Sequence, residues 1–187
     1  MTLLKPNKGL LLVAKPSIIG DVSFNRSVIL LAEHTIENGS VGFILNKPLN
    51  HTLKDFIPEI NSELPVYNGG PVAQDNLYFV HTIPELIPES IEISHEIYWG
   101  GEFSAVSKLL ADDKLCESQI RFFLGYSGWS AKQLEKELTR NSWVITPNEY
   151  KNKIFGSANT NLWKEKMLDL GGSYRLWSNA PENPSYN

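Results

Sequence analysis

The chain has 187 residues, of which 42% are hydrophobic and 20% are charged, and its formal net charge at pH 7 is −4. These values are typical of one globular domain with a core of its own, and the acidic balance argues against direct nucleic-acid binding through a broad basic surface. The one cysteine, Cys116, excludes an internal disulfide and a thiolate cluster for zinc, and the four histidines share no ligand spacing. We therefore expect neither a metal nor a cofactor.

The apolar stretches are short. The run Gly9–Ala14 ends at Lys15-Pro16 and is too short and wrongly flanked for an export signal, and no stretch approaches the ~20 apolar residues of a membrane span. We expect a cytoplasmic protein without a membrane attachment. We also expect a loose N-terminal arm over 1–8, a single domain over 9–177, and an extended or disordered tail over 178–187, where prolines replace apolar residues.

Strand patterns dominate the first half of the chain. Continuous apolar runs at Leu10–Val13, Val28–Leu31 and Val41–Leu45 predict strands that are buried on both faces. Asn38-Gly39 is typical of a tight hairpin turn between the second and third of these strands. Shorter elements are predicted after them, a helix at Thr52–Ile57 and strands at Val66-Tyr67, Leu77–Val80 and Ile91–Ile93.

Helices and strands are interspersed in the second half. The helix after Ser130 begins with a serine and a glutamine, Gln133, at the spacing of a capping box, and the last helix ends at Gly171-Gly172. Early strands followed by interspersed helices predict a single mixed domain of the α+β class. The predicted elements are helix Glu102–Leu110, strand Ile120–Leu124, a helix from Ser130 to about Arg140, strand Trp143–Thr146 and helix Asn161–Leu170.

One segment, Gly125-Tyr-Ser-Gly-Trp129, lies where an α/β hydrolase would carry its nucleophile, between a predicted strand and a predicted helix. Two features count against that role: Trp129 stands where a closing glycine is needed, and all four histidines precede Ser127. We instead expect a turn at the start of a helix, in which Ser127 or Ser130 caps free amides and Trp129 packs against the helix.

Two glycine turns and one arginine leave alternatives open. The turns Asn68–Pro71 and Trp99–Glu102 either present backbone amides to an anion or supply a positive φ beside a cap, and the second reading is favoured. Arg26 is either an anion ligand or a structural partner of Glu33 or Asp21.

Several segments together resemble the YqgE/AlgH family of bacterial proteins. The resemblance implies a single mixed domain built on a partly open, barrel-like β-sheet with packed helices, and it implies no established reaction. Many members carry a cysteine directly before the Glu33-His34 pair, where this chain has Ala32, so a thiol-based activity at that position does not carry over. The matching segments are Leu12–Pro16, Phe24–Val28, Glu33-His34, Gly42–Pro48, Gly69–Pro71, Leu124–Trp129, Gln133–Glu137 and Trp143.

These family segments predict the walls of one small pocket, since they fall at strand ends and turns, where ligand sites tend to lie. Its eight expected residues are Arg26, His34, Asn46, Lys47, Gly69, Gly70, Tyr126 and Trp129. Arg26 and Lys47 suit an anionic ligand. The leading hypothesis is a non-enzymatic binding or regulatory protein, with a small anionic ligand or a protein as its partner.

Two other functions remain open. In an enzyme, Glu33 or His34 would act as general base beside Lys47, on a small carbonyl or phosphate substrate. Strand alternation places Glu33 and His34 on opposite faces, so only one of them can serve. The family name suggests a transcription-linked regulator, but the chain shows neither a helix-turn-helix pattern nor a positive net charge.

Overall fold

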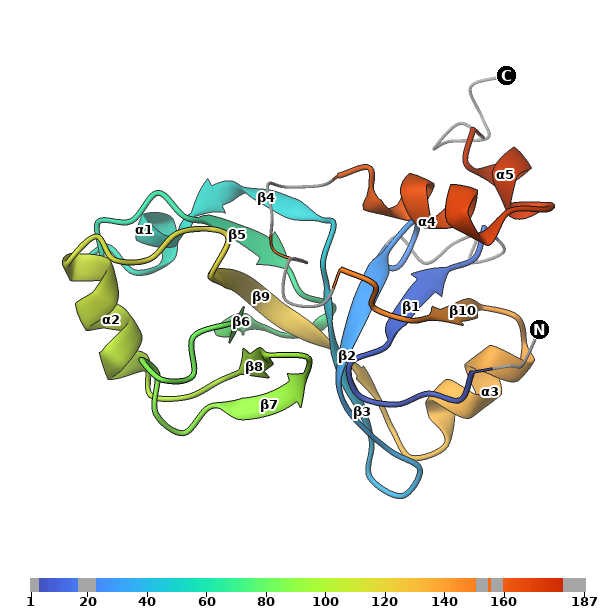
Figure 1. The fold of residues 1–187 in the computed structure, drawn as a ribbon, viewed down its shortest axis with the longest axis horizontal. Coiled ribbons are helices and arrows are strands. Elements are labelled where there is room, and N and C mark those ends of the chain that lie inside the picture. Colours follow the sequence, from blue (N-terminus) through green and yellow to red (C-terminus); the bar gives the residue numbers. More distant parts are fainter. Residues whose placement is uncertain (1–3, 17–22, 151–154, 156–159, 180–187) are drawn as a thin grey trace.

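The computed structural model describes residues 4–16, 23–150, 155 and 160–179. Within these residues, ten strands and five helices form a domain of the predicted α+β class (Figure 1). The strands are β1 (Leu11–Ala14), β2 (Val28–Thr35), β3 (Gly39–Ile44), β4 (Pro48–Thr52), β5 (Pro65–Asn68), β6 (Val72–His81), β7 (Ile91–Ser94), β8 (Ile97–Trp99), β9 (Ile120–Trp129) and β10 (Trp143–Thr146). The helices are α1 (Leu53–Phe56), α2 (Phe103–Ala111), α3 (Gln133–Thr139), α4 (Leu162–Leu170) and α5 (Tyr174–Trp177).

The ten strands belong to one largely antiparallel sheet. Neighbouring strands follow the order β10-β1-β2-β3-β9-β6-β8-β7. Off this path, β5 pairs in parallel with β9 and antiparallel with β4. Because the path ends at β10 and β7, the sheet of the described residues is open, in agreement with the partly open sheet that the family resemblance implies.

The long strand β9 joins the two halves of the sheet, which lie side by side in Figure 1. Residues 122–124 of β9 lie between β5 and β6, whereas its last residues pair with β3, Ser127 with Gly42 and Trp129 with Ser40. Gly125 allows this change of partner. Its φ is +69°, and a Cβ atom there would lie 2.7 Å from the carbonyl oxygens of Gly70 and Val72.

The helix-start turn predicted at Gly125–Trp129 is wrong, because this segment continues β9. Ser127 is fully buried, and its Oγ donates a hydrogen bond to the Gly69 carbonyl at 3.0 Å instead of capping a helix. Ser130 lies beyond the strand, and its N–H donates to Gln133 Oε1 at 3.0 Å, which is one half of the predicted capping box.

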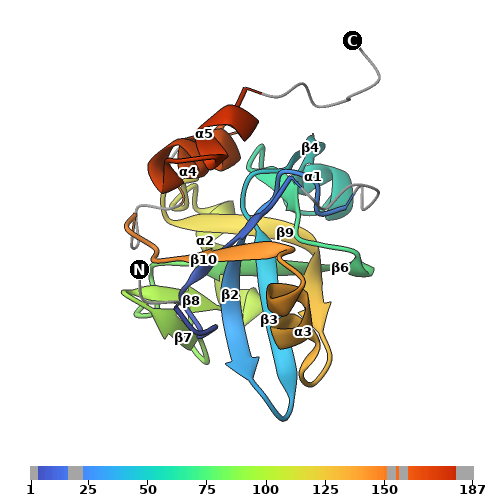
Figure 2. The ribbon, with the colours of Figure 1, turned by 90° about the vertical axis from the view of Figure 1, so that its right-hand side faces the viewer.

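Side chains of successive residues in β1, β2 and β3 enter two different cores, which confirms that these strands are buried on both faces. Leu11 belongs to the central cluster, together with Phe123 of β9 and Trp163 of α4. Leu12 belongs to the cluster beneath α3, which includes Leu134. A third cluster packs α1 and α2 against the other half of the sheet. Figure 2 shows α3 and α4 at separate parts of the sheet.

Three short elements, β4, β8 and α5, are absent from the prediction. β4 begins at Pro48 and is only partly buried, so it lacks the apolar signal of a strand. β8 has three residues and pairs with both β6 and β7. Ser178, the first residue of the expected tail, is buried and its N–H donates to the Tyr174 carbonyl at 3.1 Å. Of the two expected loose ends, 1–3 and 180–187 lie outside the described residues.

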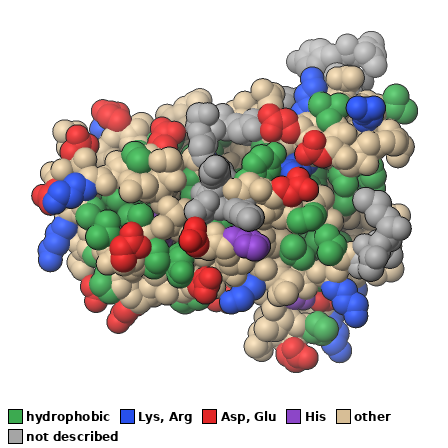
Figure 3. Space-filling view, viewed as in Figure 1, with side chains coloured by type: hydrophobic (Ala, Val, Ile, Leu, Met, Phe, Trp, Pro, Cys, Tyr) green, Lys and Arg blue, Asp and Glu red, His purple; other side chains and the backbone are tan. Residues whose placement is uncertain are grey.

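The surface gives two further observations. In the described part of the chain, no helix has the length and apolar character to cross a membrane. On the face in Figure 3, acidic and basic side chains are interspersed, and no broad basic area dominates the view.

His81 at the end of β6 is fully buried. Its Nδ1 accepts the Ile83 N–H at 3.3 Å, so Nε2 carries the proton and lies 2.9 Å from Ser90 Oγ and 3.2 Å from the Gly100 carbonyl. Burial lowers the pKa of His81, with the Gly100 carbonyl and Glu85 acting weakly in the opposite direction. A second proton would also displace the Ile83 N–H from Nδ1.

Acid is therefore expected to destabilise the domain through His81. The unfolded chain takes up a proton at His81 near pH 6.5, whereas the folded chain resists it. The unfolding free energy should fall as pH drops below about 6.5 and level off below the folded pKa. Urea unfolding at a series of pH values measures this slope, and the difference between wild type and His81→Gln isolates the contribution. Identical slopes for the two proteins would contradict the assignment.

Candidate functional site

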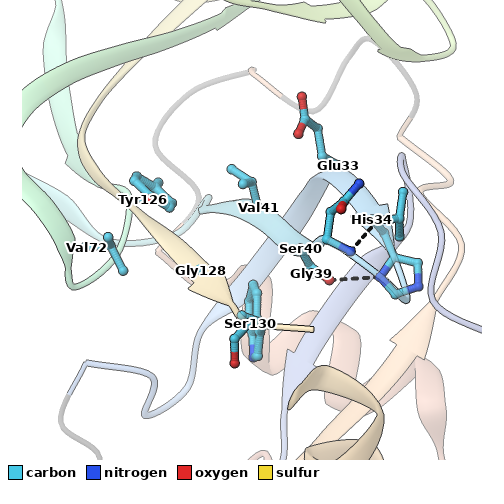
Figure 4. A pocket seen from close by; sticks show the side chains of 12 residues that line it. Glu33, His34, Gly39, Ser40, Val41, Val72, Tyr126, Gly128 and Ser130 are labelled. Carbon is cyan, nitrogen blue, oxygen red and sulfur yellow. Dashed lines mark hydrogen bonds between the residues drawn. The ribbon is translucent and has the colours of Figure 1, made fainter. Parts of the chain in front are cut away.

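The structure places the eight expected site residues in three locations. His34, Tyr126 and Trp129 line one pocket of about 400 Å³, which we call the histidine pocket (Figure 4). Residues Arg26, Asn46 and Lys47 line another of about 370 Å³, the cationic pocket. Gly69 and Gly70 line neither of these two and lie where β5 passes β9.

The cationic pocket lies between the turn before β2, the connection from β3 to β4, and α4. Three of its lining residues carry a positive charge, Arg26, Lys47 and Lys164, and no lining residue that the structure describes carries a negative charge. The remaining lining residues are Asn25, Asn46, Thr160, Asn161, Trp163 and Ser178. Such a wall is positive and rich in hydrogen-bonding groups, which suits an anion.

Asn46 holds this pocket together. Its side chain is nearly buried; Oδ1 accepts the Val28 N–H at 2.8 Å, and Nδ2 donates to the Arg26 carbonyl at 2.8 Å. Lys47 Nζ donates to the Ser23 carbonyl at 2.7 Å. From the connection between β3 and β4, Asn46 and Lys47 thus fix the turn of residues 23–26. This role explains why polar residues directly follow the apolar run of β3.

The Arg26 side chain is positioned by an aromatic ring. Its backbone has a φ of +53°, and its guanidinium carbon lies 5.0 Å from the centre of the Trp163 ring. Trp163 is itself anchored, since its Nε1 donates to the Ala14 carbonyl at 2.7 Å. The stacking orients Arg26 along one wall of the cationic pocket. The alternative pairing of Arg26 with Asp21 lies outside the described residues.

Two polar side chains of the histidine pocket, Ser40 and His34, form a row with Glu135, which does not line the pocket. His34 Nδ1 lies 2.8 Å from Ser40 Oγ, across the β2–β3 hairpin, where the two residues are direct partners. His34 Nε2 lies 3.6 Å from Glu135 Oε1, in the first turn of α3. The hairpin between the second and third runs is confirmed, but its turn comprises residues 36–38, and Gly39 already pairs with Thr35.

A β-bulge decides which of Glu33 and His34 faces this row. The register of β2 against β3 shifts between Leu31 and Glu33, so Ala32 is an extra residue without a partner on β3. Strict alternation would place Glu33 on the same face as Leu31, beneath α3; the extra residue brings His34 there instead. Figure 4 shows Glu33 directed away from His34, so the two side chains point in different directions, as predicted.

Trp129 and Tyr126 form the other wall of the histidine pocket. Trp129 Nε1 donates to Glu137 Oε2 at 2.9 Å, and Trp143 Nε1 donates to the same oxygen at 2.7 Å. One carboxylate on α3 therefore fixes both indole rings. Tyr126 packs edge-on against Tyr78, with 5.5 Å between the ring centres.

Gly69 and Gly70 serve packing. A Cβ atom on Gly69 would lie 2.1 Å from the Gly125 carbonyl oxygen, so only glycine allows β5 and β9 to approach this closely. The Gly69 N–H donates to the Leu124 carbonyl at 2.9 Å, and the Gly70 N–H donates to Asn68 Oδ1 at 3.0 Å. These two amides are engaged within the fold, which favours the structural reading of this turn over an anion site.

Sequence reasoning missed three residues in or beside the two pockets. Lys164 reaches the cationic pocket from α4, far along the chain from Arg26, and no local pattern marks it. Ser40 was missed because a two-residue turn at Asn38-Gly39 would set His34 opposite Phe43, whereas the turn of residues 36–38 sets it opposite Ser40. Glu135 depends on where α3 packs, which the sequence does not reveal.

A buried arginine was also missed. Arg121 of β9 is 5% exposed; Nη1 donates to the Leu45 carbonyl at 2.9 Å and Nη2 to the Phe155 carbonyl at 3.2 Å. Its guanidinium carbon lies 4.2 Å from the centre of the Tyr67 ring. Burial lowers the pKa of Arg121 and raises the pKa of Tyr67, and proximity of the two partly offsets each shift. Arg121 thus braces the chain immediately before Asn46.

Two solved structures have the same fold. The crystal structure of protein DIP2367 from Corynebacterium diphtheriae has a TM-score of 0.75 at 23% identity, over 96% of this chain and 95% of that chain. The solution structure of the AlgH protein from Pseudomonas aeruginosa has a TM-score of 0.71 at 24% identity, over 97% of this chain and 98% of that chain. At these identities the likeness concerns the fold alone.

Relatives of higher sequence identity show the family of this chain. A UPF0301 protein of Bacteroides fragilis is 40% identical over 184 residues, which cover 97% of this chain and 92% of the relative. A UPF0301 protein of Chlorobium phaeobacteroides is 39% identical over 184 residues, which cover 98% and 97%. The family model described as AlgH-like (DUF179) matches residues 11–175. These matches confirm the resemblance found in the sequence, and the chain belongs to the AlgH-like family.

Proposed function

We propose that this protein binds a small anionic ligand in the cationic pocket and acts as a binding or regulatory protein. One observation carries the proposal: Arg26, Lys47 and Lys164 converge on one pocket, and its lining within the described part of the chain includes no Asp or Glu. A volume of about 370 Å³ suits a small metabolite. The positive side chains of the pocket would attract a negatively charged ligand strongly, because the site is partly enclosed.

The side chains suit a phosphate or carboxylate group. The guanidinium of Arg26 offers paired N–H donors that match two oxygens of such a group, while Lys47 and Lys164 act as point charges. Trp163 and Ser23 hold Arg26 and Lys47 in place before a ligand arrives, through the cation–π stacking and the lysine hydrogen bond. This reduces the conformational entropy that binding would otherwise cost.

The same lining favours binding over catalysis. The nine lining residues include no His, Asp, Glu or Cys, the residue types that most often transfer protons or act as nucleophiles. Asparagines and a buried serine, Ser178, provide neutral groups that could orient a ligand. The expected cytoplasmic location, and a regulatory role exerted through a protein partner, belong to this proposal.

A ligand panel tests the proposal directly. Purified protein would be titrated with phosphate, pyrophosphate, nucleotides, sugar phosphates and dicarboxylates, with thermal unfolding and calorimetry as readouts. A ligand at a hundred times its dissociation constant should stabilise the fold by about 2.7 kcal/mol. We expect at least one phosphate- or carboxylate-bearing compound to bind, and Lys164→Gln to weaken it about tenfold.

Matched variants separate the site from general charge effects. Lys136→Gln removes one exposed positive charge from α3, outside the lining of the cationic pocket, and should leave binding unchanged. Arg26→Lys keeps the charge but loses the paired donors, so it should also weaken binding. If no compound binds, or if Lys164→Gln and Lys136→Gln have equal effects, the proposal is wrong.

A further inference from the structure

The histidine pocket carries a second chemistry, which the proposed anion binding does not use. Ser40 Oγ, the His34 ring and the Glu135 carboxylate follow one another at 2.8 Å and 3.6 Å. The His34 side chain is nearly buried, with 9% of its surface exposed, and it lies between the Ser40 hydroxyl and the Glu135 carboxylate. Within the described residues, Glu135 Oε1 is buried and makes no hydrogen bond, so its contact with His34 is its closest polar partnership.

The order of these groups is the one that activates a hydroxyl. A serine hydroxyl is a poor nucleophile until a base removes its proton, and a carboxylate on the far side of the imidazole fixes the tautomer and orientation of that base. The hairpin register and the bulge at Ala32 bring His34 to Ser40, and α3 adds Glu135. The carboxylate distance is long for a hydrogen bond, as catalytic contacts often are before substrate binds.

The pocket walls indicate the class of substrate. Among the described residues, no Lys or Arg lines this pocket, whereas Glu33 does, which disfavours an anionic substrate. Val72, Tyr126 and Trp129 give this pocket apolar surface. Trp129 is the direct partner of Ser40 across β3 and β9, whereas Tyr126 and Val72 lie beside Gly128. These features fit an uncharged small ester with an apolar acyl group.

We propose that Ser40 is a nucleophile that accepts an acyl group from small uncharged carboxylic esters, with His34 as its general base and Glu135 as a positioning residue. Ser40 Oγ forms a bond to the carbonyl carbon while its proton moves to His34 Nδ1. The ester C–O bond then breaks, and His34 returns the proton to the leaving alcohol. Water hydrolyses the acyl-serine in the same way, giving a carboxylic acid and regenerating Ser40.

Active-site labelling tests the nucleophile. A fluorophosphonate probe would be incubated with the folded protein and with the protein in urea, and the labelled peptide would be identified by mass spectrometry. We expect Ser40 to be labelled only in the folded protein, and labelling to fall at least about 100-fold in His34→Gln. Ser104→Ala, which alters an exposed serine on α2 outside this pocket, should label like wild type.

Hydrolysis of p-nitrophenyl acetate and butyrate tests the other roles. Ser40→Ala should abolish turnover, and Glu135→Gln should lower kcat at least about tenfold with little change in KM, whereas Glu135→Asp should restore part of it. Lys108→Gln, which removes an exposed charge on α2 outside both pockets, should leave hydrolysis unchanged. Labelling of Ser40 is read independently of ligand binding in the cationic pocket, so the two proposals can fail separately. Absence of label on Ser40 in the folded wild type, or equal labelling of His34→Gln, would overturn the proposal.

Discussion

Replacing Gly69 by alanine is expected to lower the unfolding free energy by more than about 4 kcal/mol, enough to leave much of the protein unfolded. The added Cβ atom would lie 2.1 Å from the Gly125 carbonyl oxygen and 3.0 Å from the Gly125 carbonyl carbon. Both are backbone atoms of β9, so no side-chain rotation can relieve the clash. Either β5 separates from β9, or Gly125 moves and the change of partner along β9 is lost.

Gly128→Ala is the matched control for this prediction. Gly128 also lies on β9, but the atoms nearest to its added Cβ would be Tyr126 Cε2 at 3.0 Å and Val72 Cγ2 at 3.4 Å. Side chains can shift by a few tenths of an ångström, so the loss should be about 1 kcal/mol. Urea unfolding followed by circular dichroism compares the two variants. Similar midpoints for both would show that the β5–β9 crossing tolerates a methyl group.

Arg121→Met is expected to destabilise the domain by about 3 kcal/mol, although methionine fills much of the same volume. Replacing both members of a buried ion pair by apolar residues often leaves the free energy of unfolding unchanged, because neither charge remains buried without its partner. Arg121 differs from such a pair. Two acceptors of Arg121 are backbone carbonyls, of Leu45 and Phe155, and no side-chain substitution can remove them. They would be left without these donors in the core, and the stacking on Tyr67 would be lost as well.

The size of the Arg121 effect can be measured by urea unfolding at neutral pH. Arg121→Lys retains a charge and up to three donors, but it cannot reach two carbonyls with a rigid fork, so its loss should be smaller than that of Arg121→Met. Because Leu45 directly precedes Asn46, both variants should also weaken ligand binding in the cationic pocket. A neutral or stabilising Arg121→Met would contradict the role assigned to these hydrogen bonds.

Local sequence patterns predicted those elements whose signal is local. β10 and the hairpin of β2 and β3 follow from continuous apolar runs and from Asn38-Gly39. Gly125–Trp129 was misread because a glycine, a serine and a polar stretch after them suggest a turn, whereas pairing with β3 and β6 keeps the segment extended. Such pairing joins residues far apart in the chain, Gly42 with Ser127 and Val72 with Tyr126, which periodicity cannot detect.

The candidate site was predicted in its residues more than in its arrangement. Arg26, Asn46 and Lys47 do lie together, because Asn46 bonds to the backbone on both sides of Ser27. His34 lies in another pocket, and its orientation depends on the bulge at Ala32, which alternation alone cannot anticipate. Lys164 and Glu135 enter from helices whose docking is set by the completed core.

The position of β9 between β3 and β6 has a consequence for how the chain acquires its fold. A nascent chain that ends before residue 129 holds β1, β2 and β3 without the neighbour that covers the free edge of β3, and β10 has yet to be added beside β1. The loop-closure entropy of joining β3 to β9 must be offset before these pairings stabilise anything, which favours slow folding in one cooperative step. During synthesis the β2–β3 hairpin would remain an exposed edge. Its tip carries the charged residues Glu33 and Glu37 on either side of the exposed Ile36, and these charges would limit pairing with other chains.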